Sequence, residues 1–304
     1  FQESAVSGGE SVLPVTVGLR YMLAGAFCFS LTALFVRLLR GLPFMEIVVI
    51  RSVVTAVLSF GFLWSRRLPF MGTHRGLLFL RGLLGFFGLS AYFYTLMELP
   101  LAEAVTLQYL NPVFAAAMSP WLLGERWKGS EWAAILLAFL GVVAIANPSV
   151  PDKWFVACVG VFGALMSGAA YGVVRKLGLL GESSLNIVVA FPVVAFVLGL
   201  PLAVPVWAPP TQLQWLMLLG LGVVTQAAQI FLTIGLRLER AAKATAVNYS
   251  VILFSTFYSV FLGEGIPLAS WVGMACIIGG LALVSRKKKA RPEPYRDLVD
   301  TDFP

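Results

Sequence analysis

The chain alternates long apolar runs with short polar breaks, which is the pattern of a helical membrane protein. Each run holds about 20 residues, enough for an α-helix to cross a hydrocarbon core about 30 Å thick. Strands of a membrane barrel would alternate apolar and polar residues, and stretches such as residues 133–146 do not. We therefore predict an all-α integral membrane fold with ten transmembrane helices. The predicted spans cover residues 19–39, 47–64, 76–97, 101–123, 130–147, 154–175, 184–204, 212–236, 243–262 and 266–284.

Two copies of one sequence pattern, Leu-Gly-Glu followed by Trp and then Gly, lie 139 residues apart. The copies are Leu123–Glu125 with Trp132 and Gly141, and Leu262–Glu264 with Trp271 and Gly280. Such a repeat predicts two five-helix halves, residues 1–148 and 149–285, followed by a basic and then acidic cytoplasmic tail, residues 286–304. Because five is odd, the second half enters the membrane from the opposite side. The repeat is therefore inverted, an arrangement suited to alternating access.

Composition and charge place the chain in a membrane and set its orientation. Of its 304 residues, 59% are hydrophobic and 12% are charged, against about 25% charged in soluble domains. With the termini on one side, 17 of the 22 Lys and Arg residues fall on that side and three on the other. Because loops rich in Lys and Arg stay in the cytoplasm, we expect both termini to be cytoplasmic, in a multi-pass protein of the plasma membrane. Most of these charges sit at helix ends, which argues against a nucleic-acid partner.

The chain lacks the groups that an enzyme would need. His74 is its single histidine, and no Gly-x-Ser-x-Gly, His-Glu-x-x-His or phosphate-binding loop occurs. Cys28, Cys158 and Cys276 all fall in apolar runs, where a thiol packs as a small hydrophobic group. The first 14 residues do not match a secretory signal peptide. We therefore predict neither catalysis, nor a cofactor, nor a bound metal.

The first copy of the repeat and its surroundings resemble the EamA-type repeat of the drug/metabolite transporter superfamily. The matching segments are Leu99–Ala104, Asn111–Phe114, Leu123–Glu125 and, more weakly, Ala241–Glu264. Glu46–Arg51 and Leu80–Gly82 are similar to the S-adenosylmethionine-uptake and solute carrier family 35 G-type members. The resemblance covers residues 19–285. It implies a ten-helix transporter whose first, third, fourth, sixth, eighth and ninth helices surround a central cavity.

Two polar pairs, Gln108–Tyr109 and Asn248–Tyr249, occupy matching positions in the fourth and ninth spans. Because the halves enter from opposite faces, we expect the pairs to bracket a space about 12 Å tall around the membrane midplane. Asn111, which precedes Pro112, adds a helix break whose freed carbonyl group is available to this space. These residues are candidate substrate ligands. The alternative is that they form hydrogen bonds between helices.

Further polar side chains lie near the same space. Gln226 and Gln229 lie three residues apart, on one face near the centre of the eighth span, and their amides can donate and accept hydrogen bonds. Tyr92, Tyr94 and Tyr171 offer an aromatic face and a hydroxyl tip. For each of these residues, helix packing is the alternative.

Arg51 and Arg81 are the arginines that fall inside predicted spans. A buried guanidinium group binds carboxylate or phosphate through two hydrogen bonds, so both arginines favour an anionic substrate. In straight helices their depths differ by about 15 Å, so we do not expect both to hold one carboxylate. The alternative for each is a side chain that extends to the nearer membrane surface.

These observations predict a secondary transporter that moves a small, polar, charged or amphiphilic organic metabolite by alternating access. The alternative is a non-transporting membrane scaffold or receptor on a transporter fold. The expected partners are the small-molecule substrate and the lipid bilayer, while a coupling proton or counter-substrate and a homodimer are left open. Glu46, Glu103, Glu125 and Glu264 sit at span ends, and we expect them at the surface, with Glu125 and Glu264 bonding to nearby helix ends. The alternative is that one of these carboxylates gains and loses a proton and so couples transport to a proton gradient.

Overall fold

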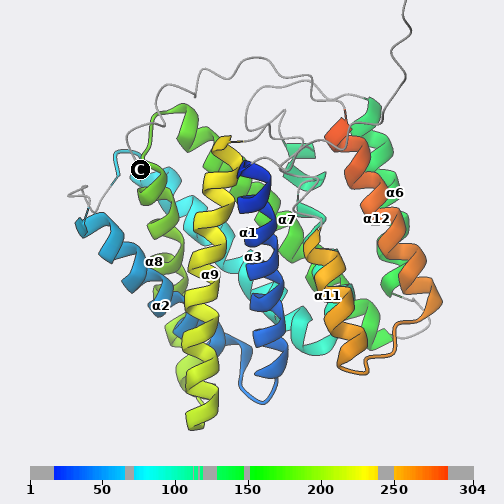
Figure 1. Cartoon of the computed structure of the whole chain (residues 1–304), viewed down its shortest axis with the longest axis horizontal. Coiled ribbons are helices and arrows are strands. Elements are labelled where there is room, and N and C mark those ends of the chain that lie inside the picture. The colour runs from blue at the N-terminus through cyan, green and yellow to red at the C-terminus, as the bar shows by residue number, and fades with distance from the viewer. Residues whose placement is uncertain are drawn as a thin grey trace, which may run out of the picture.

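The computed structural model is a bundle of α-helices, with no strand among the residues it describes (Figure 1). Each predicted span contains one helix within the described part of the chain, which confirms the all-α membrane fold. Six of these helices, α1, α2, α3, α7, α8 and α9, are long and apolar enough to cross a membrane. The described residues are 17–65, 72–111, 113–115, 117–118, 129–146, 151–238 and 250–286.

Each half of the chain contributes five of these helices. The first half contributes α1 (Val17–Leu38), α2 (Phe44–Ser65), α3 (Arg75–Glu98), α4 (Leu101–Gln108) and α6 (Gly129–Ala146). The second half contributes α7 (Pro151–Leu179), α8 (Ser184–Ala203), α9 (Gln212–Leu238), α11 (Ser250–Phe261) and α12 (Leu268–Arg286), with a short 3-10 turn at Val204–Val206.

The most extensive helix contacts are related to one another by exchange of the two halves. Helix α1 packs along α9, and its counterpart α7 packs along α3. In the same way α1 contacts α11, and α7 contacts α4. Two further pairs, α2 with α8 and α6 with α12, join each helix to its own counterpart, and α4 contacts α11 where the fourth and ninth spans meet. These contacts are those of two equivalent repeats related by a pseudo-two-fold axis.

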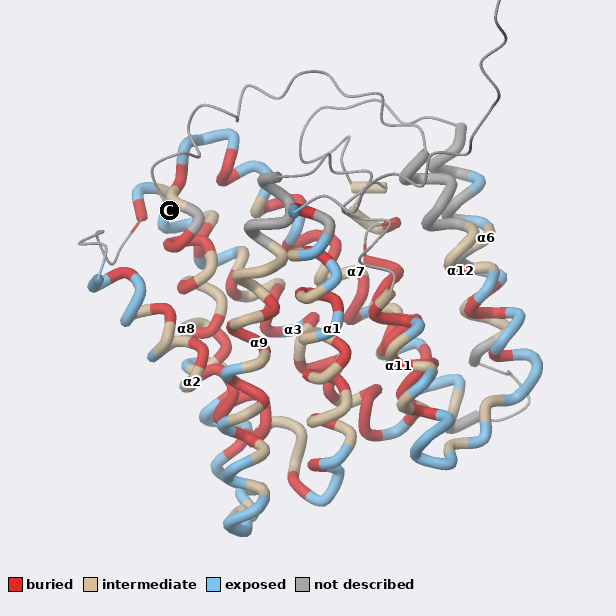
Figure 2. The backbone as a smooth tube through the Cα atoms, viewed as in Figure 1, coloured by how far each residue is buried: buried red, intermediate tan, exposed pale blue. Residues whose placement is uncertain are grey.

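The centre of the bundle is the most buried part (Figure 2). All seven residues Leu101–Leu107 of α4 are buried, including the polar Glu103 and Thr106. By contrast, α6 and α12 lie side by side at one edge and carry many exposed residues (Figure 2). Helix α4 therefore lies in the interior of the bundle.

In its second copy, the Leu-Gly-Glu pattern forms the turn that ends α11. Gly263 follows the end of α11 with a φ of +71°, a conformation that glycine adopts without a steric penalty. The backbone N–H of Gly263 donates to the Val260 carbonyl, and that of Glu264 donates to the Ser259 carbonyl, as in a Schellman motif. This turn ends the helix and directs Glu264 back toward the bundle.

The last glycine of the pattern, which is Gly141 in the first copy, allows α6 and α12 to approach closely. A Cβ atom added at Gly141 would lie 2.6 Å from the backbone oxygen of Gly273 and 2.6 Å from Cγ1 of Ile277, both in α12. Because one of these atoms is backbone, it cannot move aside without separating α6 from α12. The Gly141 position therefore sets the distance between the two helices.

We predict that Gly141→Ala lowers the unfolding temperature of the purified protein, by an amount equivalent to about 1–3 kcal/mol, because overpacking strains the α6–α12 contact. Gly279→Ala is the matched control, since its Cβ would lie 3.3 Å from Cδ2 of Leu137, the end of a flexible side chain. Thermal unfolding in detergent measures both variants. Equal effects of the two substitutions would contradict the assignment.

Candidate functional site

Arg51 of α2 and Arg81 of α3 meet in the interior at one aromatic ring. The guanidinium carbon of Arg51 lies 5.4 Å from the ring centroid of Phe191 in α8, and that of Arg81 lies 4.9 Å from it. Arg51 also lies 5.9 Å from the ring centroid of Phe93 in α3. All three distances are within the range of a cation–π interaction. One phenyl ring is therefore shared by two cations.

This arrangement corrects the spacing expected from straight helices. Two guanidinium carbons at these distances from one centroid lie within about 10 Å of each other, the range that two cation–π contacts to one ring impose. The depths of the helix positions had predicted about 15 Å. That value counts backbone positions alone and leaves out the reach of the two side chains.

Neither arginine extends to a membrane surface. Arg51 is only 4% exposed. A Cβ atom added at Gly85 would collide with Nη1 of Arg81 and with the Phe191 ring. Gly85 lies one turn beyond Arg81 toward the middle of α3, so the guanidinium group points inward along the helix. The absent side chain of Gly85 provides the space that the cation and the ring occupy.

The fourth span is broken near its middle, next to Asn111, which confirms the predicted break. Helix α4 ends at Gln108, Tyr109 and Leu110 form a turn, and helical backbone resumes at Asn111. Pro112 itself lies outside the described residues. Asn111 and Tyr109 are both buried. The break brings irregular backbone into the protein interior, where such backbone in a membrane is tolerated.

Helix α7 packs directly against this break. A Cβ atom added at Gly168 would lie 2.7 Å from the backbone oxygen of Asn111, so only glycine permits the contact. One residue earlier, Ser167 accepts a hydrogen bond at its Oγ from Nε2 of Gln108, at 3.0 Å. The amide oxygen of Gln108 is buried and has no hydrogen-bond partner among the described residues. An acceptor is therefore available beside the break.

Of the other residues predicted to bind substrate, some pack against neighbouring helices and others are partly exposed. Gln226 is buried, and its Oε1 accepts a hydrogen bond from Ser59 of α2 at 3.3 Å, in keeping with the helix-packing alternative. Tyr94 packs edge to face on Phe44, with ring centroids 5.7 Å apart. Gln229 and Tyr92 are half-buried, and Tyr171 of α7 is 46% exposed and interacts electrostatically with Arg81. Asn248 and Tyr249 lie outside the described residues.

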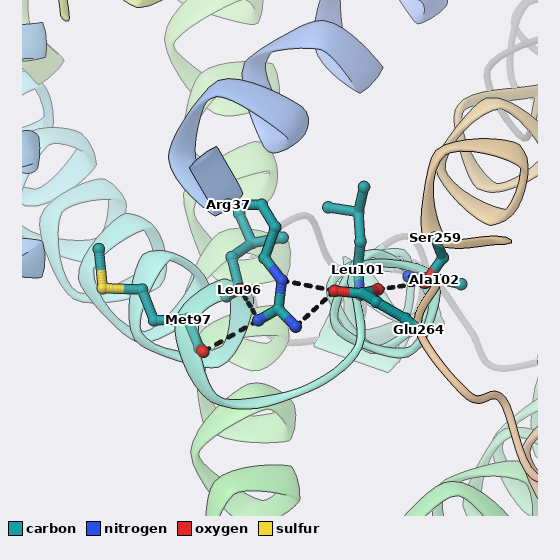
Figure 3. A network of polar contacts seen from close by, with 7 residues as sticks. All are labelled: Arg37, Leu96, Met97, Leu101, Ala102, Ser259 and Glu264. Carbon is teal, nitrogen blue, oxygen red and sulfur yellow. Dashed lines mark hydrogen bonds and ion pairs between the residues drawn. The ribbon is translucent and has the colours of Figure 1, made fainter. Parts of the chain in front are cut away.

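A second polar network joins the two halves at the outer end of the bundle, meaning the end formed by residues 38–46, 98–103, 204–212 and 261–270 (Figure 3). Glu264 forms an ion pair with Arg37, at the end of α1. The Leu101 backbone N–H at the start of α4 donates to Glu264 at 2.8 Å, and Ser259 donates its hydroxyl to the same carboxylate. Glu264 therefore bonds a helix end, as predicted for it.

All three guanidinium nitrogens of Arg37 have partners in this network. Its Nε donates to Glu264, and its Nη1 donates to the backbone oxygens of Leu96 and Met97, at 3.0 and 2.9 Å (Figure 3). These two carbonyl groups lie in the last turn of α3, where a cation is favourable to the helix dipole. One ion pair thus links α1, α3, α4 and the turn after α11.

Two more glutamates bridge the halves at the outer end. Glu103 of α4 is fully buried, accepts a hydrogen bond from Ser270 of α12 at 2.6 Å, and pairs with Lys153 of α7 at 3.0 Å. Glu46 of α2 is also fully buried and accepts the backbone N–H of Ala208 at 3.0 Å. The expectation that these glutamates lie at the surface is wrong, because each finds partners in the other half. Glu125 lies outside the described residues.

At the opposite end, Glu182 between α7 and α8 binds the start of α3. It accepts hydrogen bonds from the backbone N–H of His74, from the hydroxyl of Thr73 and from the side-chain amide of Asn186. Burial raises the pKa of the Glu182 carboxyl, but these hydrogen bonds lower it more, so the pKa lies below its ordinary value. Glu182 is therefore a carboxylate that holds the halves together at neutral pH.

Three side chains at these positions were not predicted from the sequence: Phe191, Ser59 and Ser167. Phe191 is one of 23 phenylalanines, and nothing in its surroundings predicts that two arginines share it. Ser59 and Ser167 are small polar residues inside spans, which is the signal that could have identified them. Within the described residues, no three His, Cys, Asp or Glu side chains are grouped as a metal site would require.

The sequence matches the EamA-like transporter family twice, over residues 16–147 and again over residues 155–286. The chain belongs to this family. Its structure is also similar to that of a protein in a solved crystal structure, with a TM-score of 0.63 over 90% of this chain and 99% of the other, at 19% identity. The match in two copies agrees with the exchange symmetry of the helix contacts.

Relatives of this EamA transporter include proteins with named substrates. It is 30% identical to the pseudopaline exporter CntI of Pseudomonas aeruginosa, over 90% of this chain and 97% of the exporter. It is 26% identical to solute carrier family 35 member G1 of Homo sapiens, over 86% and 77% of the two chains. It is 25% identical to the S-adenosylmethionine uptake transporter of Rickettsia prowazekii, over 69% and 72%. The chain is thus an integral, multi-pass membrane transporter.

We predict that Glu264→Gln in this EamA transporter lowers its unfolding temperature, equivalent to roughly 1–3 kcal/mol. The substitution leaves Arg37 without its counterion and removes the charged acceptor from the start of α4. Glu98→Gln is the control, because Glu98 is exposed at the same end of the bundle. Thermal unfolding in detergent measures both; an unchanged Glu264→Gln protein would show that the pair does not hold the halves together.

Proposed function

We propose that the chain is a secondary transporter that carries a small, polar, charged or amphiphilic organic metabolite by alternating access. The observation that carries this proposal is that the most extensive helix contacts are related by exchange of the two halves. A fold built from two such repeats can adopt two conformations of nearly equal energy, one open to each side. Substrate then binds between the repeats, near the midplane.

The broken fourth span supports a central site. Non-helical backbone at membrane depth occurs where it is enclosed by protein or lines a water-filled cavity. Here it lies beside α7, with the buried and unpartnered Oε1 of Gln108 and the turn at Tyr109–Leu110 next to it. Together with Arg51 and Arg81, these groups form the substrate site that we propose.

The outer polar networks support a conformation that is closed at the outer end. Glu264, Glu103 and Glu46 each bond across the two halves there. Opening this end requires these bonds to break, while the substrate supplies compensating contacts at the centre. The distribution of Lys and Arg along the sequence supports cytoplasmic termini, and we propose the plasma membrane as the location.

Transport in liposomes tests the proposal, with a disulfide that locks the outer end as an internal control. The backbone nitrogen of Ala102 lies 3.5 Å from Oγ of Ser259, so we place the cysteine pair at these two positions, one in α4 and one in α11. The variant is Ala102→Cys/Ser259→Cys, made after Cys28, Cys158 and Cys276 have been replaced. We expect saturable flux in its reduced form, loss of flux on oxidation, and recovery on reduction.

The experiment distinguishes failure of the transport function from failure of alternating access. The cysteine-free parent, treated with the same oxidant, should transport unchanged. Absence of flux for every member of a broad metabolite panel would favour the scaffold or receptor alternative. Full flux through the oxidised, demonstrably crosslinked variant would retain transport but reject alternating access at this end.

A further inference from the structure

Three arginines in the structure differ in how their charges are satisfied. Arg37 has a carboxylate and two backbone carbonyl groups as partners. For Arg51, Nε and Nη1 are buried with no hydrogen-bond partner among the described residues, and for Arg81 the same is true of Nε. The ion pairs formed among the described residues involve neither Arg51 nor Arg81.

Arg51 is buried and Arg81 is half-buried, and holding two such cations in the interior without partners is costly. Removing a guanidinium group from water costs several kcal/mol, and two like charges within about 10 Å repel in a medium of low dielectric constant. Cation–π contacts with Phe191 and Phe93 offset only part of this, because an uncharged ring supplies neither a countercharge nor a hydrogen-bond acceptor. A negative charge between the two arginines would supply both the missing acceptors and the missing countercharge.

Resting on the transport function proposed above, we propose that the substrate is an organic anion whose carboxylate or phosphate group binds between Arg51 and Arg81. The guanidinium groups come from α2 and α3 in the first half, and the ring they share, Phe191, comes from α8 in the second half. An anion held there contacts both repeats. Binding can therefore respond to their relative movement.

The surroundings also define the rest of the ligand. The rings of Phe93 and Phe191 provide an apolar surface on which the uncharged part of the molecule can pack. Tyr171 of α7 lies near Arg81 and adds a hydroxyl group that can donate to an anion. An organic anion with an apolar or planar body fits this site better than an inorganic ion does.

The site is built to keep both cations in the interior. Gly85 leaves the space for the Arg81 guanidinium group and the Phe191 ring, and an alanine there would force one of them to move. An arginine retained only for stability would be expected to have hydrogen-bond partners, as Arg37 does. The unpartnered arrangement instead sacrifices stability in the empty protein for binding.

The test measures ligand-dependent thermal stabilisation and liposome flux for the whole protein. The probes are organic mono- and dicarboxylates, organic phosphate esters, their neutral amide or methyl ester analogues, and organic cations of similar size. The variants are Arg51→Gln and Arg81→Gln, with Arg40→Gln as the control because Arg40 is exposed at the outer end. The carboxylate and phosphate arms distinguish the two anion chemistries.

We expect anions, and not their neutral analogues, to stabilise the parent protein and to be transported. Arg51→Gln and Arg81→Gln should each weaken anion binding at least about tenfold, as loss of a charge-assisted hydrogen bond predicts, while Arg40→Gln should not. Without ligand, both interior variants should unfold at the same or a higher temperature than the parent. Arg37→Gln, which breaks a satisfied ion pair, should unfold at a lower one.

Each contrary result has a separate meaning. Flux of a cation or neutral molecule that is unchanged in Arg51→Gln and Arg81→Gln would overturn the anion site and leave the transport function standing. Anion binding that depends on both arginines, without flux of that anion, would support the site and reject transport. Absence of anion stabilisation across the panel, or destabilisation of both empty interior variants, would overturn the site.

Discussion

The structure depends on one constraint: a charged side chain inside a bilayer needs an opposite charge or hydrogen-bond partners. At the outer end, ion pairs meet this requirement and hold the repeats together. Glu264 pairs with Arg37 across the halves (Figure 3), and Glu103 pairs with Lys153 across them as well. In the centre it is not met, since Arg51 and Arg81 share the Phe191 ring without an anionic partner among the described residues. Charged groups at the outer end therefore have partners across the halves, whereas the two arginines at the centre have none among the described residues.

The need to pair buried charges explains the repeated Leu-Gly-Glu pattern. Gly263 adopts a left-handed conformation that ends α11, and the turn brings Glu264 against Arg37 and the first N–H of α4. A helix start carries unsatisfied N–H groups and partial positive charge, so a carboxylate is well placed there. The pattern therefore supplies a contact between repeats, and its bonds are among those that the proposed opening of the outer end would break.

The sequence predicted the elements well because apolar length and repeat spacing determine them locally. All ten spans contain a helix in the described residues, the break beside Asn111 is present, and the two-repeat architecture is confirmed. The sequence did not predict the Arg51–Phe191–Arg81 group, because depth along straight helices ignores the reach and direction of side chains. It also placed Glu46 and Glu103 at the surface, since their partners, Ala208 and Ser270, lie more than 160 residues away.

The central claim is that the outer end opens while anion is held at the centre. Distance measurement by electron spin resonance tests it directly, with spin labels at Arg40→Cys and Phe261→Cys, two exposed positions at the outer ends of α1 and α11. In a background without native cysteines, the account predicts two distance populations whose proportions change when a transported anion is added. Glu264→Gln should shift the balance toward the longer distance, because it removes the ion pair that closes this end. A single distance, unchanged by substrate and by Glu264→Gln, would contradict the account.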